Sequence, residues 1–209
     1  MQKKAYIFCN NDYKGFEITF DLAGIIIASD GGANFLCANG IIPDILIGDC
    51  DSIAPECLAQ LKGKTLIKEF PSSKDKTDTE LALDFCLENG YTNIMLINAI
   101  DGRFSHSLAN IFLMEKFAPQ VSFIHFLNKE NEIFIVKDYI NIFAQKDELF
   151  SLLPLTESVS VIETKGLKFT LKNEKLFRES TRGISNSPVA DQIEVRISKG
   201  ILLIIKEKG

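Results

Sequence analysis

The stretch Pro43-Asp44-Ile45-Leu46-Ile47-Gly48-Asp49-Cys50-Asp51-Ser52 is typical of a short buried strand that ends in an acidic turn. An earlier segment repeats this pattern, because the apolar run Ile25-Ile26-Ile27-Ala28 leads into Ser29-Asp30-Gly31-Gly32-Ala33-Asn34. In open α/β sheets, ligands bind at the carboxyl ends of the strands. We therefore expect both acidic turns at the ligand-binding edge of such a sheet.

A third acidic segment, Ser73-Lys74-Asp75-Lys76-Thr77-Asp78-Thr79-Glu80, opens the clearest helix of the chain. Thr77 and Glu80 have the spacing of a capping box, in which each residue satisfies a free backbone N–H at the helix start. Gly90 is a suitable stop, because glycine readily ends a helix. The sequence therefore predicts a helix that begins at Thr77 and ends before Gly90.

Short apolar runs alternate with helical patterns through the first 127 residues. Strands separated by helices indicate a mostly parallel sheet. A second helix is expected from Ser105 to Phe117, where Pro119 closes it. We expect this α/β domain over residues 1–130, with strands at Ala5 to Cys9, Ile25 to Ala28, Ile45 to Ile47, Thr65 to Phe70, Asn93 to Ala99 and Val121 to Leu127.

The hydrophobic period changes to two after about residue 128, which is typical of antiparallel strands with one buried face. The segment from Gln192 to Ser198 alternates, and the pattern continues after the Lys199-Gly200 turn, so we expect a hairpin there. Further strands are expected from Ser158 to Glu163 and from Leu167 to Leu171. Residues 140–209 are therefore predicted to form a small antiparallel β-sandwich domain.

Composition excludes several broad classes of protein. The formal net charge of -5 disfavours a nucleic-acid partner, since such binding needs a Lys/Arg face. The five cysteines are odd in number and include no CxxC pair, so we expect neither a disulfide framework nor a zinc knuckle, and a reducing cytoplasm as the location. No apolar run approaches the roughly 18 residues of a membrane span, so no membrane or export segment is expected.

Asp49, Asp51 and Asp78 are the strongest candidates for chemistry. Each alone has an ordinary explanation in turn formation or in the helix dipole. Together they repel, because two carboxylates about 5 Å apart interact unfavourably by roughly 3 kcal/mol at an effective dielectric near 20. A hard divalent cation relieves this repulsion, and Mg²⁺ commonly binds one or two carboxylates together with substrate phosphates.

Lys74, Lys76 and Arg103 lie in the same loops as the acids and are candidates for binding phosphate, as are the N–H groups near Gly31-Gly32. Solvated loop lysines remain an equally good interpretation of Lys74 and Lys76. The chain has neither the P-loop motif nor the dinucleotide fingerprint, so any nucleotide is bound in another way. His106 has neighbouring serines but no nucleophile elbow, which disfavours a hydrolase triad.

Five motifs occur in order along the chain: Ser29 to Asn34, Pro43 to Ser52, Asp75-Lys76-Thr77-Asp78, Gly102-Arg103-Phe104 with Leu108-Ala109-Asn110, and Gly166-Leu167-Lys168-Phe169 with Gly183-Ile184-Ser185-Asn186. This ordered set resembles the motifs of the thiamine pyrophosphokinase (thiamine diphosphokinase) family over nearly the full length of the chain.

The resemblance implies a Rossmann-like, nucleotide-binding catalytic domain followed by a β-sandwich that binds thiamine. It also implies a homodimer with active sites at the subunit interface, which transfers the pyrophosphoryl group of ATP to the hydroxyl of thiamine and releases AMP.

The resemblance also implies roles for individual residues. Asp49, Asp51 and Asp78 would be catalytic and would bind Mg²⁺. Asp30, Gly31, Lys74, Thr77 and Arg103 would bind the nucleotide, and Phe169, Ser185 and Asn186 would contact thiamine.

The sequence departs from the family pattern at two positions. Many relatives carry Trp where Phe169 stands, and many have an acid where Ser105 stands.

Two other functions fit the acidic turns without the resemblance, namely a metal-dependent nucleotide phosphohydrolase and a non-enzymatic nucleotide sensor. Release of phosphate without thiamine would identify the first, and ATP binding without turnover would identify the second.

Overall fold

The computed structural model describes residues 2–208 of the chain, which form two compact units. The first unit contains the residues up to Leu113 together with Gln120–Lys129. The second contains Met114–Pro119 and the residues from Glu130 onward.

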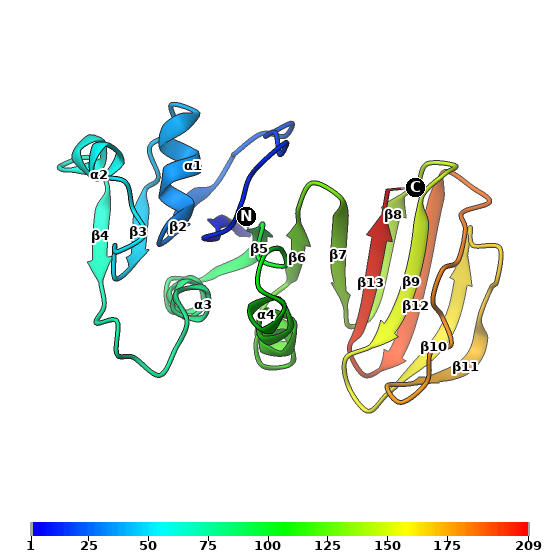
Figure 1. Cartoon of the computed structure of the whole chain (residues 1–209). Helices are drawn as coiled ribbons and strands as arrows, with labels where there is room; N and C mark the ends of the chain where they lie inside the picture. Colours follow the sequence, from blue (N-terminus) through cyan, green and yellow to red (C-terminus); the bar gives the residue numbers. More distant parts are fainter. Residues whose placement is uncertain (1, 209) are drawn as a thin grey trace. The chain divides into compact units, whose positions relative to one another are not determined.

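The first unit is built on a parallel sheet of strands in the order β4-β3-β2-β1-β5-β6 (Figure 1). The central strand β1 pairs with β2 on one side and β5 on the other. The predicted parallel sheet is confirmed, with strands at β1 (Lys3–Phe8), β2 (Ile25–Ser29), β3 (Ile45–Gly48), β4 (Leu66–Glu69), β5 (Tyr91–Ile97) and β6 (Phe123–Leu127).

The strand order reverses at β1, because the chain proceeds from β1 outward to β4 and then returns to place β5 on the other side of β1. Such a reversal leaves a crevice at the carboxyl ends of the two central strands, where doubly wound folds bind their ligands. The segments that follow β1 and β5 therefore lie at the expected ligand-binding position.

Helices follow the strands of this sheet, at α1 (Gly32–Ala38), α2 (Pro55–Leu61), α3 (Asp78–Glu88) and α4 (Phe104–Phe117). A 3₁₀ turn, η1 (Ala118–Gln120), follows α4, and the residues from Met114 to Pro119 belong to the second unit. The hydroxyl of Thr77 caps α3 by accepting a hydrogen bond from the Glu80 N–H at 3.2 Å. Gly90 follows the helix with a φ of 73°. The predicted N-cap at Thr77 and the predicted stop at Gly90 are thus confirmed.

The second unit contains two antiparallel groups of strands, β7-β13-β9 and β11-β10-β12-β8. Their inward-facing residues form one core, in which Phe150, Leu202 and Ile204 are fully buried. The predicted β-sandwich is confirmed, with strands β7 (Asn131–Val136), β8 (Tyr139–Phe143), β9 (Leu149–Pro154), β10 (Ser158–Lys165), β11 (Lys172–Phe177), β12 (Gln192–Lys199) and β13 (Leu202–Glu207).

Two predictions for this unit are wrong. The strands on either side of Gly200 do not form a hairpin, because β12 pairs with β10 and β8 whereas β13 pairs with β7 and β9. Both strands bury apolar residues in the same core, so alternation alone could not distinguish one sheet from two. The segment Leu167–Leu171 is not a strand either, since only Leu167 makes an isolated bridge, to Pro188, and β11 begins at Lys172.

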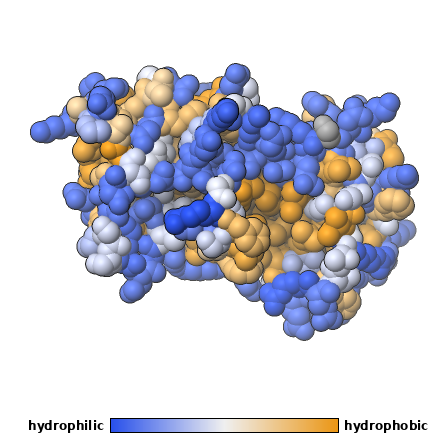
Figure 2. Space-filling model, viewed as in Figure 1, coloured by the Kyte–Doolittle hydropathy of each residue, from blue (hydrophilic) through white to orange (hydrophobic). Residues whose placement is uncertain are grey.

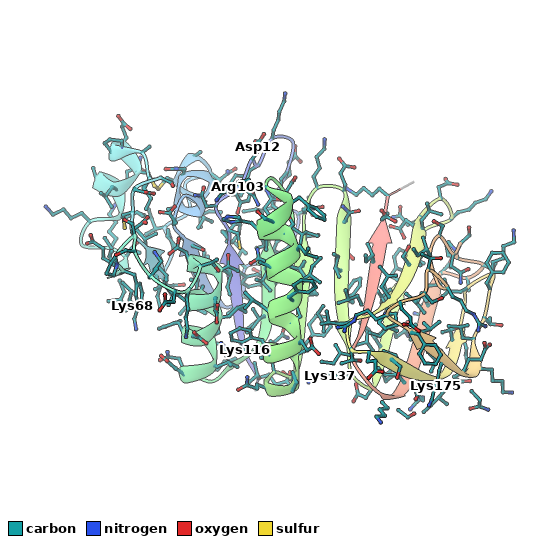
Figure 3. All side chains as sticks on the ribbon, turned by 60° about the horizontal axis from the view of Figure 1, so that its bottom comes forward. Asp12, Lys68, Arg103, Lys116, Lys137 and Lys175 are labelled. Atoms are coloured by element: carbon teal, nitrogen blue, oxygen red, sulfur yellow. A yellow bond between two sulfur atoms is a disulfide. The ribbon has the colours of Figure 1, made fainter. Side chains whose placement is uncertain are left out.

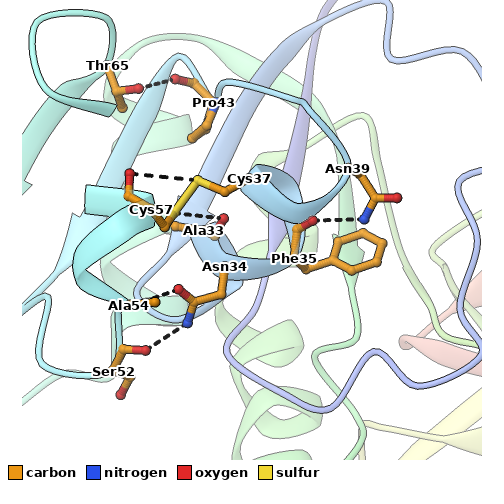
Figure 4. The surroundings of a disulfide bond; sticks show 10 residues. All are labelled: Ala33, Asn34, Phe35, Cys37, Asn39, Pro43, Ser52, Ala54, Cys57 and Thr65. Atoms are coloured by element: carbon orange, nitrogen blue, oxygen red, sulfur yellow. Dashed lines mark hydrogen bonds between the residues drawn. A yellow bond between two sulfur atoms is a disulfide. The ribbon is translucent and has the colours of Figure 1, made fainter. Parts of the chain in front are cut away.

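A disulfide joins Cys37 of α1 to Cys57 of α2 (Figure 4), which corrects the expectation that the cysteines form no disulfide. The pair is 20 residues apart in sequence and shows no recognised spacing motif. The two short helices bring the residues together by packing against one another, which the spacing of the cysteines did not reveal. Cys9, Cys50 and Cys86 are free thiols.

The surface differs between the two units on the face seen in Figure 2, where hydrophobic residues gather over strands of the second unit. Large apolar side chains with substantial exposure in that unit include Tyr139, Phe143, Phe169 and Phe177. Among residues 2–208, no helix has both the length and the apolar character needed to cross a membrane.

Candidate active site

Three carboxylates meet at the ends of β2 and β3. Oxygen atoms of Asp30, Asp49 and Asp51 all lie within 4.8 Å of one another. Asp30 directly follows β2, and the other two follow β3, as the acidic turns predicted. Asp30, which the resemblance places in the same cluster as a nucleotide-binding residue, is the third member of this group, whereas Asp78 lies outside it.

The Asp30 side chain is held in this position by its backbone and by a neighbouring loop. Its backbone has a φ of 47°, which is uncommon for a residue other than glycine. Its side chain is buried, and Oδ2 accepts a hydrogen bond from Nδ2 of Asn10 at 2.9 Å. A side chain at Gly31 would displace the Asn10 amide, because a Cβ at that position would lie 2.2 Å from Oδ1 of Asn10.

Lys74 connects the acidic turns. Its Nζ lies 2.9 Å from Oδ1 of Asp78 and 3.9 Å from Oδ2 of Asp49. Partial burial would lower the pKa of Lys74, but the hydrogen bond and the charge of Asp78, together with the charge of Asp49, raise it above its ordinary value. Lys74 therefore supplies a firmly protonated cation next to the carboxylates.

The pKa values of Asp78 and Asp49, the two acids that pair with Lys74, shift in opposite directions. Burial raises the pKa of Asp78, and this effect outweighs the opposing hydrogen bond and charge of Lys74. Burial also acts to raise the pKa of Asp49, but the hydrogen bond from the Asp51 backbone and the charge of Lys74 outweigh it, so the pKa of Asp49 is lowered. Burial and the neighbouring charges thus act together on the pKa of both acids.

A cleft of about 360 Å³ opens beside this group and gathers residues from the segments that follow β1, β2, β3, β4 and β5. It is lined by Asp30, Asp49, Asp51, Thr77, Asp78 and Arg103 among the predicted residues. Gly31 and Lys74 do not line it. Gly31 directly follows Asp30, and Lys74 pairs with Asp78, and both of these acids do line the cleft.

Arg103 reaches this cleft from the start of α4, on the segment that follows β5 (Figure 3). The preceding residue, Gly102, has a φ of 78°, which lets the chain turn sharply into the helix. A cationic side chain therefore faces the same cleft as four carboxylates, an arrangement suited to a ligand that carries both phosphate and metal.

Sequence reasoning missed several residues of the cleft, above all Asn10 and Asn11, which follow β1. Asparagine is common in turns, so these two carried no distinguishing signal. Their place after the central strand of a reversing sheet was the only indication available. Cys9, Ser29, Ser52, Thr79, His106 and Asn110 complete the lining.

The predicted residues of the second unit form a separate local arrangement. Phe169 is 64% exposed, and Nζ of Lys168 lies 5.5 Å from the centre of its ring. Asn186 is buried beneath it, where its Nδ2 donates to the Phe169 carbonyl at 2.7 Å and its Oδ1 accepts from the Phe169 N–H at 3.0 Å. Ser185 is exposed and has a φ of 56°.

Two family models match the chain in succession. The catalytic domain of thiamin pyrophosphokinase matches residues 16–125, which is more than half of the chain. The vitamin B1 binding domain of thiamin pyrophosphokinase matches residues 137–202. The chain belongs to the thiamine pyrophosphokinase family.

Known relatives agree with this assignment. The chain is 32% identical over 186 residues to the thiamine pyrophosphokinase of Bacillus subtilis (strain 168), and the match covers 86% of each protein. A crystal structure of thiamine pyrophosphokinase from Bacillus subtilis superposes with a TM-score of 0.86 at 26% identity, covering 99% of this chain and 100% of that one. A thiamin pyrophosphokinase structure from Geobacillus thermodenitrificans has the same fold, with a TM-score of 0.83 at 24% identity, covering 99% and 98% of the two chains.

Membership in the thiamine pyrophosphokinase family confirms the predicted activity. The chain is a kinase that acts in thiamine diphosphate synthesis, transferring a pyrophosphoryl group to thiamine, and the family uses ATP as its other substrate. The vitamin B1 binding model spans the Phe169 and Asn186 arrangement. The family assignment also decides against the phosphohydrolase and the sensor.

Proposed function

We propose that the cleft in the first unit binds ATP with Mg²⁺, and that the arrangement around Phe169 binds thiamine. Residues 1–130 would thus form the nucleotide-binding catalytic domain and residues 140–209 the thiamine-binding domain. The observation that carries this proposal is the meeting of Asp30, Asp49 and Asp51 within 4.8 Å. These acids share their cleft with the cationic Arg103.

The carboxylates fit a hard divalent cation. They offer only oxygen ligands, which Mg²⁺ prefers, and Oδ1 of Asp30 is buried without a hydrogen-bond partner. We assign Asp49, Asp51 and Asp78 as metal-binding and catalytic residues, with Asp30 beside them. Bound Mg²⁺ would neutralise phosphate charge and lower the barrier to displacement at phosphorus.

The cationic side chains would hold the phosphates in line for the reaction. We assign this role to Arg103 and to Lys74, which would exchange part of its contact with Asp78 for a phosphate oxygen. Thr77 lines the cleft while its hydroxyl caps α3, so it would act near the phosphates from a rigid position. Gly31 would allow the loop after β2 to pass close to the nucleotide.

The transfer itself makes one bond and breaks one. The hydroxyl oxygen of thiamine bonds to the β-phosphorus of ATP, the bond from that phosphorus to the oxygen bridging to the α-phosphate breaks, and AMP leaves with the electron pair. The hydroxyl proton goes to a carboxylate, for which Asp51 and Asp78 are the candidates.

Phe169 would stack on thiamine with its exposed ring. A phenyl ring attracts a cationic heterocycle through its π face, though less strongly than an indole. Ser185 is exposed and directly precedes Asn186 in the sequence. We assign both residues to the thiamine site. Asn186 would contribute indirectly, because its side-chain amide forms hydrogen bonds to the N–H and to the carbonyl of Phe169.

We further propose a homodimer with active sites at the subunit interface, located in the cytoplasm. Exposed aromatic side chains on the outer strands of the sandwich, such as Phe143 at 62%, support association, because a monomer rarely leaves many of them in water. Light scattering during gel filtration would measure the mass in solution, and a monomeric mass at micromolar concentration would refute the dimer.

The metal assignment is tested by substituting the carboxylates one at a time and titrating Mg²⁺ in the kinase assay. Asp49→Asn and Asp51→Asn are expected to raise the Mg²⁺ concentration at half-maximal rate and to lower kcat by about a hundredfold or more. Asp147→Asn is the matched control, since Asp147 is an exposed acid in the turn between β8 and β9. Normal Mg²⁺ dependence in both cleft variants would refute the assignment.

A further inference from the structure

Asn11 follows the central strand β1 and makes two hydrogen bonds to the segment after β5. Its Nδ2 donates to the carbonyl of Asn98 at 2.7 Å and to the carbonyl of Asp101 at 2.6 Å. A primary amide carries two N–H bonds, so both donors are used. Asn11 lines the cleft, yet it has no amide hydrogen left for a ligand.

The segment after β5 also donates a hydrogen bond to the loop after β1. Asn98, a buried residue with a φ of 57°, donates from Nδ2 to the carbonyl of Asp12 at 2.8 Å. Figure 3 labels Asp12 on the loop after β1 and Arg103 at the start of α4. Side-chain amides thus join two loops that are almost 90 residues apart in the chain, at the place where the strand order reverses.

The fit between Asn11 and the turn before Arg103 is also steric. A Cβ at Gly102 would lie 2.1 Å from Oδ1 of Asn11, so a side chain at this position would displace the amide. Asp101, whose carbonyl Asn11 holds, is two residues before Arg103. Two donors of α4 also contact this segment, Asn110 Nδ2 at the Ala99 carbonyl and Ser107 Oγ at the Asp101 carbonyl, but both belong to the helix that the segment leads into.

From these contacts we infer that Asn11 is a positioning residue, which fixes the Asp101-Gly102 turn from the loop after β1 and so directs Arg103 into the cleft. The inference rests on the proposed role of Arg103 in binding the phosphates of ATP. Asn11 does not touch the substrate in this account, and its effect passes through Arg103.

The same loop acts on the acidic side of the cleft through Asn10, which donates to Asp30. Neighbouring residues of one loop thereby connect the carboxylates to the cationic turn. The loop after β1 thus sets the distance between the two halves of the site, and loss of Asn11 frees only the cationic half.

A double-mutant cycle tests this inference, using the full-length enzyme and four proteins: wild type, Asn11→Ala, Arg103→Ala and the double variant. Alanine removes the amide without adding a charge that would itself repel ATP. We expect Asn11→Ala to lower kcat/KM for ATP by about tenfold, because the carbonyls of Asn98 and Asp101 lose the donor that ties them to the loop after β1, and to leave KM for thiamine within about twofold. In the Arg103→Ala background, the same substitution is expected to change kcat/KM by less than about threefold.

Equal losses in both backgrounds would overturn the inference, since Asn11 would then act independently of Arg103. If Arg103→Ala alone leaves the kinetics of ATP unchanged, the proposed role of Arg103 is wrong and the inference falls with it. The two failures are therefore distinguishable.

Two further variants separate positioning from a general loss of stability. Asn89→Ala is the matched control, because Nδ2 of Asn89 also donates to a backbone carbonyl, that of Phe85, at 2.8 Å, outside the cleft. It is expected to retain normal kinetics. Gly102→Ala keeps Asn11 but displaces the turn, and it replaces Asn11→Ala in the cycle if that variant does not fold. Additive losses for Gly102→Ala and Arg103→Ala would overturn the inference in the same way.

Discussion

The side-chain amide of Asn186 pairs with both backbone polar groups of Phe169, accepting from its N–H at 3.0 Å and donating to its carbonyl at 2.7 Å. These bonds add to the backbone contacts of the same segment, in which the Lys168 N–H donates to the Ser187 carbonyl and Leu167 bridges Pro188. Together they hold an exposed aromatic ring on a segment with no regular secondary structure, and they explain how a loop can present Phe169 in one orientation.

Phe169→Ala is expected to raise KM for thiamine by about tenfold while KM for ATP stays unchanged, because the ring is assigned to the vitamin alone. Steady-state kinetics with each substrate varied in turn provide the measurement. An equal rise in both constants would contradict the assignment.

Phe169→Trp supplies a direct reporter, since the chain contains no tryptophan. We expect the variant to bind thiamine at least as tightly as wild type, and its fluorescence to change in a saturable way as thiamine is added. A flat titration, from a variant that remains active, would show that residue 169 lies away from the vitamin.

Asn186→Ala is expected to raise KM for thiamine by a similar factor, because loss of the amide leaves the Phe169 N–H and carbonyl without their partner, at a cost of about 1–3 kcal/mol. Asn141→Ala is the matched control, as Nδ2 of Asn141 donates to an exposed side chain, that of Gln192, at 3.0 Å. Thermal unfolding of both variants separates stability from binding. Normal thiamine kinetics in a folded Asn186→Ala protein would refute this role.

His125 makes the stability of the fold dependent on pH. Burial, with a smaller contribution from the charge of Lys4, lowers the pKa of His125 to about 4. Between pH 6.5 and pH 4 the unfolded chain binds a proton that the folded chain does not, so stability falls as the pH falls.

We expect the free energy of unfolding to decrease by about 2 kcal/mol more in wild type than in His125→Gln when the pH is lowered from 7 to 5. Urea unfolding at the two pH values measures this difference. The same decrease in both proteins would show that His125 titrates normally in the folded state.

The disulfide between Cys37 and Cys57 closes a loop with a sequence separation of 20, for which the chain-entropy model gives about 3 kcal/mol of stabilisation. Dithiothreitol is therefore expected to lower the midpoint of urea unfolding in wild type and to leave a Cys37→Ala/Cys57→Ala variant unaffected. A midpoint in wild type that does not respond to reductant would contradict a formed disulfide.

Disulfides are rare in the cytosol. The proposed cytoplasmic location therefore favours reduced cysteines, whereas the structure contains the bond between Cys37 and Cys57. Alkylation of thiols in freshly lysed cells, followed by mass spectrometry, would give the state of both cysteines. Alkylated Cys37 and Cys57 would indicate that the pair is reduced in the cell.

The sequence predicted those parts of the structure that depend on near neighbours in the chain. The α3 boundaries followed from Thr77, Glu80 and Gly90, whose effects are confined to the ends of one helix. The acidic turns at Asp30 and Asp49 followed from the position of carboxylates after buried strands, and the topology of parallel sheets then brought them together.

Features that depend on distant residues could not be predicted in this way. Asn11 contacts a carbonyl 90 residues away, and nothing in its local sequence separates it from an ordinary turn residue. The same limit explains the wrong hairpin at Gly200, because the alternation of β12 and β13 shows which side chains are buried but not which strand each one pairs with.

The most direct test of the account is product analysis of the purified protein incubated with ATP, Mg²⁺ and thiamine. We predict equal amounts of AMP and thiamine diphosphate, with no product when EDTA is present or thiamine is omitted, and a rate reduced by about a hundredfold or more in Asp51→Asn. Release of inorganic phosphate without thiamine diphosphate, or a normal rate in Asp51→Asn, would contradict it.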